Sequence, residues 1–518
     1  MSDGDKLSEV DIGAQDVEEW PEIVATQPVE GHVLTPDWVK DAVFYHIFPD
    51  RFATSIRVEK PPTLEPWEAP PTTHGFKGGD LLGVLEHLDY LTDLGVDALY
   101  FCPIFQSTAN HRYHTHDYYQ VDPILGGNAA FKRLLDEAHR RGMRIVLDGV
   151  FNHASRGFYQ FNHLLENGQA SPYLDWFPVP TFPLHAYDDG GPAGYQAWWG
   201  LKALPKFNHA TPQVRAFLLG VAEYWITQGI DGWRLDVPGD IDDDTFWRAF
   251  RRRVKAQNPD AYIVGEIWHR ADRWLVGDQF DAVMNYQFTR ACYSFFVDLD
   301  ATTRALTHGH SYGALDTYDA CQFAQRLEAI LAWYPSAIAS AQLNLLGSHD
   351  TARFLTIARG DTSALKLAYL TMMTYPGAPM IYYGDEIGLE GGRDPDCRRA
   401  MLWDQSRWNH DLLTAVKRYI ALRKHYAAVW RDGAYARLYA QGLVYVFARQ
   451  RDRQTVVVGL NAGTREAKLD LDVHFLLPDG VPVRAEWSGQ QYTVTDGYVR
   501  GISIPARDGC VWVGEKPS

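Results

Sequence analysis

The chain has 518 residues, of which 46% are hydrophobic and 13% aromatic, and it carries a formal net charge of −16. This length exceeds one small domain and suits a large barrel with an appended domain. The excess of acidic residues argues against a nucleic-acid or anionic-membrane partner, because phosphate contacts require Lys and Arg, whereas a neutral ligand is compatible with it.

Targeting and redox features predict a soluble, cytoplasmic protein. Residues 1–20 contain neither the basic nor the apolar region of a signal peptide. No apolar run approaches the ~18 residues that cross a membrane. The five cysteines are far apart and show neither zinc-site nor disulfide spacing. Residues 1–35 are expected to form an acidic, partly disordered leader.

In chain order, short apolar segments alternate with segments of helical periodicity. Strands are predicted at 42–48, 97–103, 143–150, 232–237, 261–267, 282–287, 341–347 and 379–383. Helices are predicted at 81–94, 128–141, 212–227, 245–256 and 411–426, and over much of 297–340. Eight strands alternating with helices are typical of a (β/α)8 TIM barrel, an α/β fold.

Two segments depart from this alternation. Residues 151–208 form a long irregular stretch, rich in Pro, Gly, Trp and Asn, after the third strand. After residue 431, strands at 443–449 and 454–461 follow one another with no helix between them. This second pattern predicts a small antiparallel β domain at the C-terminus.

Polar residues gather at the C-terminal ends of the predicted strands, where a barrel places its chemistry. They are Asp148, Asn152 and His153 for the third strand, Arg234 and Asp236 for the fourth, Glu266 and Trp268 for the fifth, His349, Asp350 and Arg353 for the seventh, and Asp385 and Glu386 for the eighth. Any one of these groups is compatible with a structural ion pair. Together they predict a functional site, because unpaired buried charges are too costly to accumulate without use.

Arg234 and Asp236 lie two residues apart in the strand candidate GWRLDV, so their side chains share one face. Because a nearby cation favours a carboxylate, we expect Arg234 to keep Asp236 ionised and nucleophilic. Glu266 is flanked by Ile267 and Trp268, and we expect this more apolar place to keep it protonated. Two carboxyl groups with separated pKa values serve the hydrolysis of a glycosidic bond.

Four motifs make the chain resemble glycoside hydrolase family 13, the α-amylase family, over roughly residues 40–515. They are DGVFNH (148–153), GWRLDV (232–237), GEIWH (265–269) and LGSHD (346–350). The resemblance implies that Asp236 is the nucleophile, Glu266 the general acid/base and Asp350 the residue that holds the hydroxyls of the distorted sugar. It also implies a barrel (domain A) at 36–150 and 209–430, an inserted domain B at 151–208, and a C-terminal β-sandwich at 431–518.

Further matches concern sugar binding. His111 and Tyr113, in the segment NHRY, resemble residues that cover the sugar at the cleavage point, although Tyr113 is also compatible with loop packing. The remaining substrate-binding predictions are His153, Arg234 and His349 for the same sugar, Asp394 and Arg398 for its neighbour, and Arg353. Trp268, two residues beyond Glu266, is expected to stack on the leaving sugar; the alternative is a wall packed against the barrel rim.

The segments GEIWH, DQFDAVMNY (278–286) and LPKFN (204–208) are similar to the cyclomaltodextrinase, neopullulanase and maltogenic amylase group. Two departures qualify this similarity. That group carries an N-terminal β domain, often used in dimerisation, but only about 35 residues precede this barrel. The loop after Phe52 reads ATSIRVEKPP and lacks the group's Asn/Asp-rich calcium pattern. We therefore predict no metal or other cofactor, while calcium and a homodimer both stay open.

The resemblance implies a retaining glycoside hydrolase that cleaves α-1,4-glucosidic bonds, and some α-1,6 bonds, in malto-oligosaccharides and cyclodextrins, with transglycosylation. An α-glucosidase or a plain α-amylase of the same family shares the mechanism and is the nearer alternative. A non-catalytic carbohydrate-binding protein on the same fold is the remote one. Such proteins typically lose a catalytic carboxylate, and this chain keeps Asp236, Glu266 and Asp350.

Overall fold

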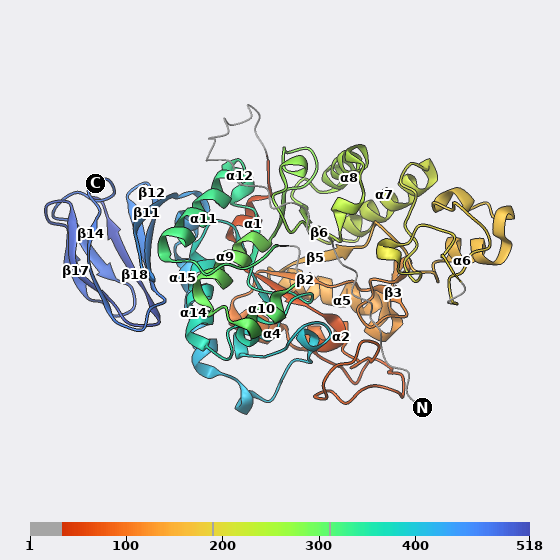
Figure 1. Ribbon diagram of the computed structural model, residues 1–518, viewed down its shortest axis with the longest axis horizontal. Coiled ribbons are helices and arrows are strands. Elements are labelled where there is room, and N and C mark those ends of the chain that lie inside the picture. The colour runs from red at the N-terminus through yellow and green to blue at the C-terminus, as the bar shows by residue number, and fades with distance from the viewer. Residues whose placement is uncertain (1–33, 189–190, 310–311, 518) are drawn as a thin grey trace.

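A closed barrel of eight parallel strands forms the centre of the computed structural model, which describes residues 34–188, 191–309 and 312–517 (Figure 1). Around the barrel the strands follow the order β1-β10-β9-β8-β7-β6-β5-β2. They are β1 (Phe44–Ile47), β2 (Ala98–Phe101), β5 (Arg144–Gly149), β6 (Gly232–Leu235), β7 (Tyr262–Gly265), β8 (Ala282–Asn285), β9 (Leu343–Leu345) and β10 (Ala378–Tyr382). Each overlaps a predicted strand, so the barrel is confirmed. Residues 1–33 of the predicted leader lie outside the described residues.

The register of the strands decides which side chains meet inside the barrel. Asp148 on β5 is paired with Arg234 on the neighbouring parallel strand β6. Because paired residues point to the same side of a sheet, these two side chains lie next to each other. β6 and β7 end one residue before Asp236 and Glu266, which places both carboxyl groups at the C-terminal rim.

Helices surround the barrel (Figure 1). They are α1 (Asp37–Asp41), α2 (Pro49–Phe52), α3 (Leu81–Glu86), α4 (Leu88–Leu94), α5 (Gly127–Arg140), α7 (Pro212–Thr227), α8 (Asp244–Gln257), α9 (Tyr286–Phe296), α10 (Ala301–Thr307), α11 (Ala320–Ala332), α12 (Ser336–Ala339), α13 (Phe354–Ile357), α14 (Thr362–Thr374), α15 (His410–His425) and α16 (Ala427–Asp432). The single helix predicted at 81–94 is interrupted at His87 and forms α3 and α4.

Sequence analysis missed several helices, and the two longest of them, α9 and α14, were missed for different physical reasons. α9 begins directly after β8, with no turn residues between them, and the Asn285 side chain caps it by accepting from the backbone N–H of Phe288 (3.1 Å). α14 is buried over most of its surface, so its sequence carries no polar stripe to reveal a helical period.

Between β5 and α7 the chain leaves the barrel and forms a lobe that contains α6 (Tyr159–Asn167), at the right of Figure 1. Bridges between His153 and Lys206, and between Ala197 and Pro205, tie distant parts of this segment together. A hairpin of β3 (Phe105–Ser107) and β4 (Thr115–Val121) precedes the lobe in the chain. The lobe thereby brings residues that are far from the strand ends in sequence to one side of the barrel mouth.

The chain beyond α16 forms two antiparallel sheets, drawn in blue at the left of Figure 1. The larger has the order β11-β12-β13-β18-β15-β16 and the smaller pairs β14 with β17. The strands are β11 (Ala434–Gln441), β12 (Val444–Arg451), β13 (Gln454–Asn461), β14 (Ala467–Asp472), β15 (Pro482–Ala485), β16 (Gln491–Thr493), β17 (Tyr498–Ile504) and β18 (Asp508–Glu515). A separate hydrophobic core that includes Val446, Leu471, Ile502 and Trp512 lies between the sheets, which confirms the predicted C-terminal β-sandwich.

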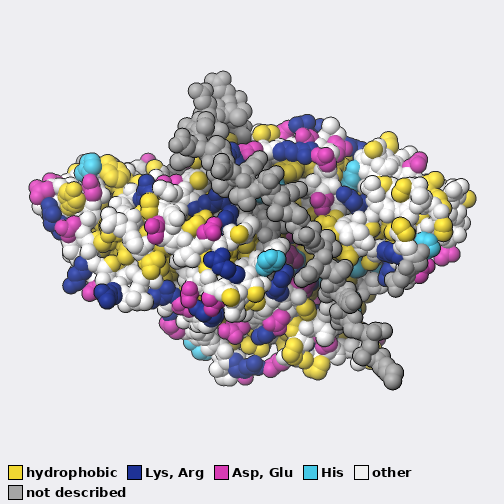
Figure 2. Space-filling model, viewed as in Figure 1, with side chains coloured by type: hydrophobic (Ala, Val, Ile, Leu, Met, Phe, Trp, Pro, Cys, Tyr) yellow, Lys and Arg dark blue, Asp and Glu magenta, His cyan; other side chains and the backbone are white. Residues whose placement is uncertain are grey.

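Acidic and basic side chains are interspersed on the face drawn in Figure 2 and are not gathered by sign. Within the described ranges, no helix combines the length and the apolar character needed to cross a membrane.

Candidate active site

A cleft of about 660 Å³ opens at the C-terminal ends of the barrel strands. All but two of the predicted site residues line it. Those that do are Asp236, Glu266, Asp350, His111, Tyr113, His153, Trp268, His349, Asp394 and Arg398. The two exceptions are Arg234, which lies buried beneath the carboxyl groups, and Arg353, which lies elsewhere. The barrel therefore gathers residues from six separate stretches of sequence into one cavity.

Arg234 is the centre of the site's electrostatics. Its Nη1 lies 3.0 Å from both carboxylate oxygens of Asp148 and 3.1 Å from Oδ1 of Asp236, and its Nη2 lies 2.9 Å from Oε2 of Glu266. The guanidinium is fully buried. Arg234 and Asp236 can both occupy this short strand segment because the planar guanidinium of Arg234 pairs with several carboxyl groups at once.

Burial opposes ionisation of these carboxyl groups. It raises the pKa of Glu266 to about 7, against the lowering effect of Arg234. Burial likewise raises the pKa of Asp236 well above its usual range, and Arg234 only partly offsets this. Arg234 thus acts on Asp236 in the direction expected from the sequence, and burial acts in the opposite direction. Because Asp148, Asp236 and Glu266 surround one guanidinium, their titrations are coupled.

Glu266 is held by groups of two further residues. The backbone N–H of Val237 donates to its Oε2 (3.2 Å), and the indole N–H of Trp268 donates to its Oε1 (3.2 Å). Val237 has a φ of +35°, in the left-handed region that a β-branched residue rarely adopts. Such strain costs on the order of 1–3 kcal/mol and clusters at functional sites. Here it occurs at the residue whose N–H meets Glu266.

Burial disfavours the charged form of three of the imidazoles that line the cleft. Burial lowers the pKa of His153 to about 3, and it lowers the pKa values of His111 and His349 well below their usual range. The ring of His349 stacks on that of Tyr113, with centroids 5.4 Å apart and an 8° angle between planes. The Tyr113 hydroxyl donates to Asp148 (2.9 Å) and lies 2.7 Å from Nε2 of His349. Neutral rings of this kind suit hydrogen bonds with uncharged sugar hydroxyls.

Arg398 lines the cleft and contacts three of its residues. Its Nη2 lies 3.3 Å from Asp350, its Nη1 lies 2.9 Å from Asp394, and its Nε donates to the backbone carbonyl of His349 (2.8 Å). The Asp350 side chain keeps 31% of its surface exposed, the largest exposure among the three proposed catalytic carboxyl groups. Asp350 is thus positioned to accept hydrogen bonds from a ligand.

Arg353 does not line the cleft, and its predicted sugar contact is not supported. It is fully buried, pairs with Asp385 (2.6 Å), and donates to the backbone carbonyls of Tyr383 (2.8 Å) and Cys397 (3.1 Å). The bond to Cys397 fixes the backbone next to Arg398. Proximity to Asp350 in the sequence suggested a sugar contact, but the chain turns Arg353 away after β9.

Sequence analysis missed a pair of tryptophans in the lobe. Trp198 stacks on His153 (5.1 Å between centroids, 17°), and Trp199 stacks on Trp198 (4.6 Å, 16°). Both line the cleft, and Trp199 is 79% exposed with a φ of +51°. The signal was present, since an adjacent Trp pair within an irregular polar stretch has no strand or helix core to enter.

The pKa of Glu266 gives an expected pH profile. If Glu266 must be protonated to donate to the leaving oxygen, kcat/KM for a natural glucan will fall about tenfold per pH unit above its pKa of about 7. Because the pKa is raised, Glu266 keeps its proton up to about pH 7, and the rate falls above that pH as the proton is lost. An aryl glycoside with an acidic phenol leaving group should lose this limb. A profile that stays flat up to pH ~9 for both substrates would contradict the role of Glu266.

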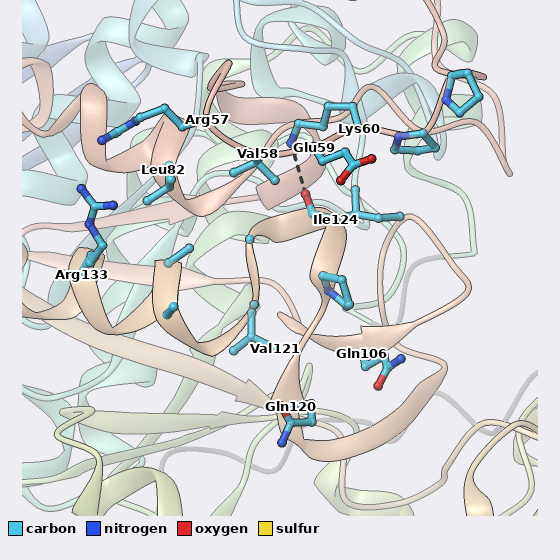
Figure 3. Close-up of a pocket in the computed structure, with 17 residues that line it drawn as sticks. Arg57, Val58, Glu59, Lys60, Leu82, Gln106, Gln120, Val121, Ile124 and Arg133 are labelled. Atoms are coloured by element: carbon cyan, nitrogen blue, oxygen red, sulfur yellow. Dashed lines mark hydrogen bonds between the residues drawn. The ribbon is translucent and has the colours of Figure 1, made fainter.

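The loop after α2 bears on calcium. The carboxylate of Asp80, at the start of α3, accepts from the backbone N–H groups of Ser55 (2.7 Å) and Gly83 (2.7 Å) and from the ammonium of Lys60 (2.7 Å). The same ammonium donates to the carbonyl of Ile124 (3.1 Å), as Figure 3 shows. Since Lys60 already sits between this buried carboxylate and the carbonyl, the loop does not fit a calcium ion, which needs several free oxygen ligands.

The hollow drawn in Figure 3, about 820 Å³, adjoins this loop and is similar in size to the cleft. Its walls are mostly Pro, Gly, Ala and aliphatic side chains, and Glu59 is the one carboxylate among the described residues that line it. Converging titratable groups, rather than volume, identify the cleft as the active-site candidate.

Replacing Lys60 with Met should destabilise the fold by about 2–3 kcal/mol, because Asp80 stays buried and loses its cation. The value lies below that of a fully buried pair, since the Lys60 side chain keeps 16% of its surface exposed. Urea unfolding measures the change. Lys132→Met is the matched control, since Lys132 and its partner Asp136 are about 60% exposed and should give less than ~0.5 kcal/mol. Equal losses in both variants would contradict the internal-cation role of Lys60.

Comparison with known proteins agrees with these features. The family described as "Alpha amylase, catalytic domain" matches residues 46–437, and that described as "Neopullulanase-like, C-terminal domain" matches residues 435–513. A cyclomaltodextrinase of Geobacillus thermopakistaniensis is 45% identical over 442 residues, which cover 85% of this chain and 71% of that protein. Neopullulanase 2 of Thermoactinomyces vulgaris is 45% identical over 431 residues, which cover 82% and 70%. The crystal structure of a debranching enzyme from Nostoc punctiforme superposes with a TM-score of 0.83 at 47% identity and covers 93% of this chain and 100% of that one.

Proposed function

The chain belongs to the α-amylase family, glycoside hydrolase family 13, and from that premise we propose that it hydrolyses α-1,4-glucosidic bonds of malto-oligosaccharides and cyclodextrins with retention of configuration. Its relatives of the cyclomaltodextrinase and neopullulanase type are glycoside hydrolases that act on α-glucans. Some cleavage of α-1,6 bonds and transfer to sugar acceptors belong to the same proposal. The observation that carries it is the pairing of Asp236 and Glu266 with opposite nitrogens of one buried guanidinium at adjacent strand ends.

The proposed reaction has two steps. In the first, Glu266 gives its proton to the glycosidic oxygen, the bond from that oxygen to C1 breaks, and the Asp236 carboxylate bonds to C1. In the second, the Glu266 carboxylate takes a proton from water, the water oxygen bonds to C1, and Asp236 is released. Asp350 holds the ring hydroxyls, His111 and Tyr113 cover the ring, and Arg398 contacts the neighbouring sugar.

Product analysis on three substrates tests this proposal. Cyclodextrin should be opened and shortened to maltose and glucose, and maltotriose should give both hydrolysis and longer transfer products. Pullulan cut at α-1,4 bonds gives a trisaccharide that retains an α-1,6 bond, whereas cleavage at α-1,6 gives maltotriose. Inactivity on cyclodextrin with release of single glucose units would favour an α-glucosidase. If none of the three substrates gave a product, the remaining alternative would be a non-catalytic carbohydrate-binding protein.

Trp268 tests how the leaving sugar is held. One indole face packs on Tyr286, with centroids 3.5 Å apart and a 7° angle, while its N–H meets Glu266. Trp268→Ala should lower kcat/KM for cyclodextrin by a few-fold to about tenfold, the effect of one aromatic contact of 0.5–1.5 kcal/mol. Hydrolysis of an activated aryl glycoside should change less, because its leaving group needs less help. Equal losses on both substrates would favour a wall that only supports Glu266.

We also propose that the enzyme works in the cytoplasm and without added calcium. Support for the first comes from the free thiols of all five cysteines, of which Cys102, Cys292 and Cys397 are buried. Support for the second comes from Lys60, whose ammonium pairs with the buried carboxylate of Asp80 at the loop after α2. Cell fractionation checks the first. Dialysis against a chelator should leave the melting temperature and rate unchanged, and loss of both with recovery on adding calcium would contradict the second.

A further inference from the structure

A cluster of three potential metal ligands lies directly behind the cleft. His46 is on β1, Cys102 follows β2, and His349 follows β9, and each of the three residues is at most 1% exposed. One donor atom from each residue lies within 4.8 Å of the other two. Among the described residues, this is the one group of three His, Cys, Asp or Glu side chains that could hold a metal ion in this way.

The two imidazoles have hydrogen-bonding capacity that the fold leaves unused. Nε2 of His46 lies 3.1 Å from Sγ of Cys102, but its Nδ1 is buried with no hydrogen-bond partner, and Nδ1 of His349 is in the same situation. A buried polar atom without a partner costs about 1–3 kcal/mol. Ring packing accounts for part of the arrangement: His46 stacks on Tyr100 (4.3 Å between centroids) and meets His349 edge-on (5.3 Å). These contacts do not satisfy the two Nδ1 atoms.

The chemistry of the three ligands selects a metal class. Burial keeps both imidazoles uncharged, so each ring has a lone pair to offer. Two neutral imidazoles and a thiol that can lose its proton to the metal form a set of N and S donors. Such donors suit zinc and its softer congeners and do not suit calcium or magnesium, which prefer oxygen.

The distances require small movements. Zinc binds sulfur at ~2.3 Å and nitrogen at ~2.0–2.1 Å, so two such donors on a tetrahedral ion lie about 3.6 Å apart. His46 and Cys102 would separate by about 0.5 Å from their present 3.1 Å. The three donor atoms all lie within 4.8 Å of one another, so no pair would close by more than about 1.4 Å. Rotations of buried side chains cover such changes without moving the strands.

We propose that His46, Cys102 and His349 form an inhibitory binding site for a divalent ion of the zinc class. His349 also lines the cleft, where its Nε2 lies 2.7 Å from the Tyr113 hydroxyl. An ion that draws His349 toward His46 and Cys102 takes this imidazole from the sugar site. The ion is therefore an inhibitor and not a cofactor, and this consequence rests on the proposed function.

Binding can be measured apart from activity. Chelator-treated enzyme titrated with Cd²⁺ should develop a thiolate-to-metal charge-transfer absorption that saturates at one ion per chain. Cys102→Ser should abolish the band and His46→Gln should weaken binding at least tenfold. Cys321→Ser is the matched control, because Cys321 is a partly exposed free thiol on α11, outside the cluster, and the variant should keep the band. A band that survives Cys102→Ser, or disappears in Cys321→Ser, would overturn the site.

Inhibition forms the second arm of the experiment. Saturating Zn²⁺ should lower kcat on maltotriose at least tenfold in the unmodified enzyme, and chelator should restore it. Cys102→Ser, or Cys102→Ala if the first variant is unstable, should keep most of the activity and lose the inhibition. Zinc inhibition that is unchanged in these variants would contradict the proposal. A normal cadmium band in a chain inactive on every glucan would instead refute the proposed function and leave the metal site standing.

Discussion

Glu266→Gln is expected to lower kcat on cyclodextrin by about 10²–10⁴-fold, the range that a positioned proton donor contributes. Gln has nearly the same shape but cannot give a proton to the leaving oxygen. The affinity for a maltose-type product, measured by calorimetry, should change only a few-fold, because the amide still reaches the Val237 N–H. Glu166→Gln, a substitution of an exposed residue on α6, serves as the control and should leave kcat unchanged.

Asp236 tests the other half of the same mechanism. Asp236→Asn should prevent the covalent glycosyl intermediate, which mass spectrometry of the enzyme with a slow fluorinated substrate would reveal in the unmodified protein. A retaining site also requires the two carboxyl groups to lie ~5–5.5 Å apart, because attack is direct and leaves no room for water. Release of a product with inverted anomeric configuration would contradict both assignments.

Arg234→Met should destabilise the fold by about 3–5 kcal/mol at neutral pH, the usual cost of removing one partner from a buried ion pair. Met approximates the volume of the side chain, so the loss would report charge. Without the guanidinium, Asp148, Asp236 and Glu266 face one another in a buried cavity. Urea unfolding at several pH values measures the effect.

The pH dependence of that loss has a definite sign. Removal of Arg234 raises the folded-state pKa values of the three carboxyl groups further above their unfolded values, so the folded variant binds more protons than the unfolded chain. The deficit should therefore be small near pH ~4, where the three buried groups are protonated in both the folded enzyme and the folded variant, and should grow as pH rises. Arg253→Met, which breaks a solvent-exposed pair with Glu223, should cost less than ~1 kcal/mol at every pH. A deficit for Arg234→Met that does not vary with pH would indicate lost packing instead.

The sequence by itself determined the barrel, the C-terminal sandwich and the position of the site. Apolar segments of strand length alternate with amphipathic ones, and this pattern is local, so it can be read without knowing the fold. Asp236 and Glu266 were located because a residue that follows a barrel strand must lie at the rim, wherever the strand sits in the barrel. The same local rule failed for Arg353, because a side chain three residues past Asp350 is placed by the turn that follows, which pairs it with Asp385.

Only the tertiary structure decided which distant groups meet and what protonation they favour. Arg234 pairs with Asp148 and Glu266 through the register of three strands, and burial of the whole set raises carboxyl pKa values that the neighbouring cation alone would lower. Lys60 contacts Asp80, and His46 contacts Cys102, although the residues of each pair are too far apart in the sequence for a helical or strand period to predict the contact. The physical reason is that desolvation and pairing depend on distances between elements, and closure of the barrel sets those distances.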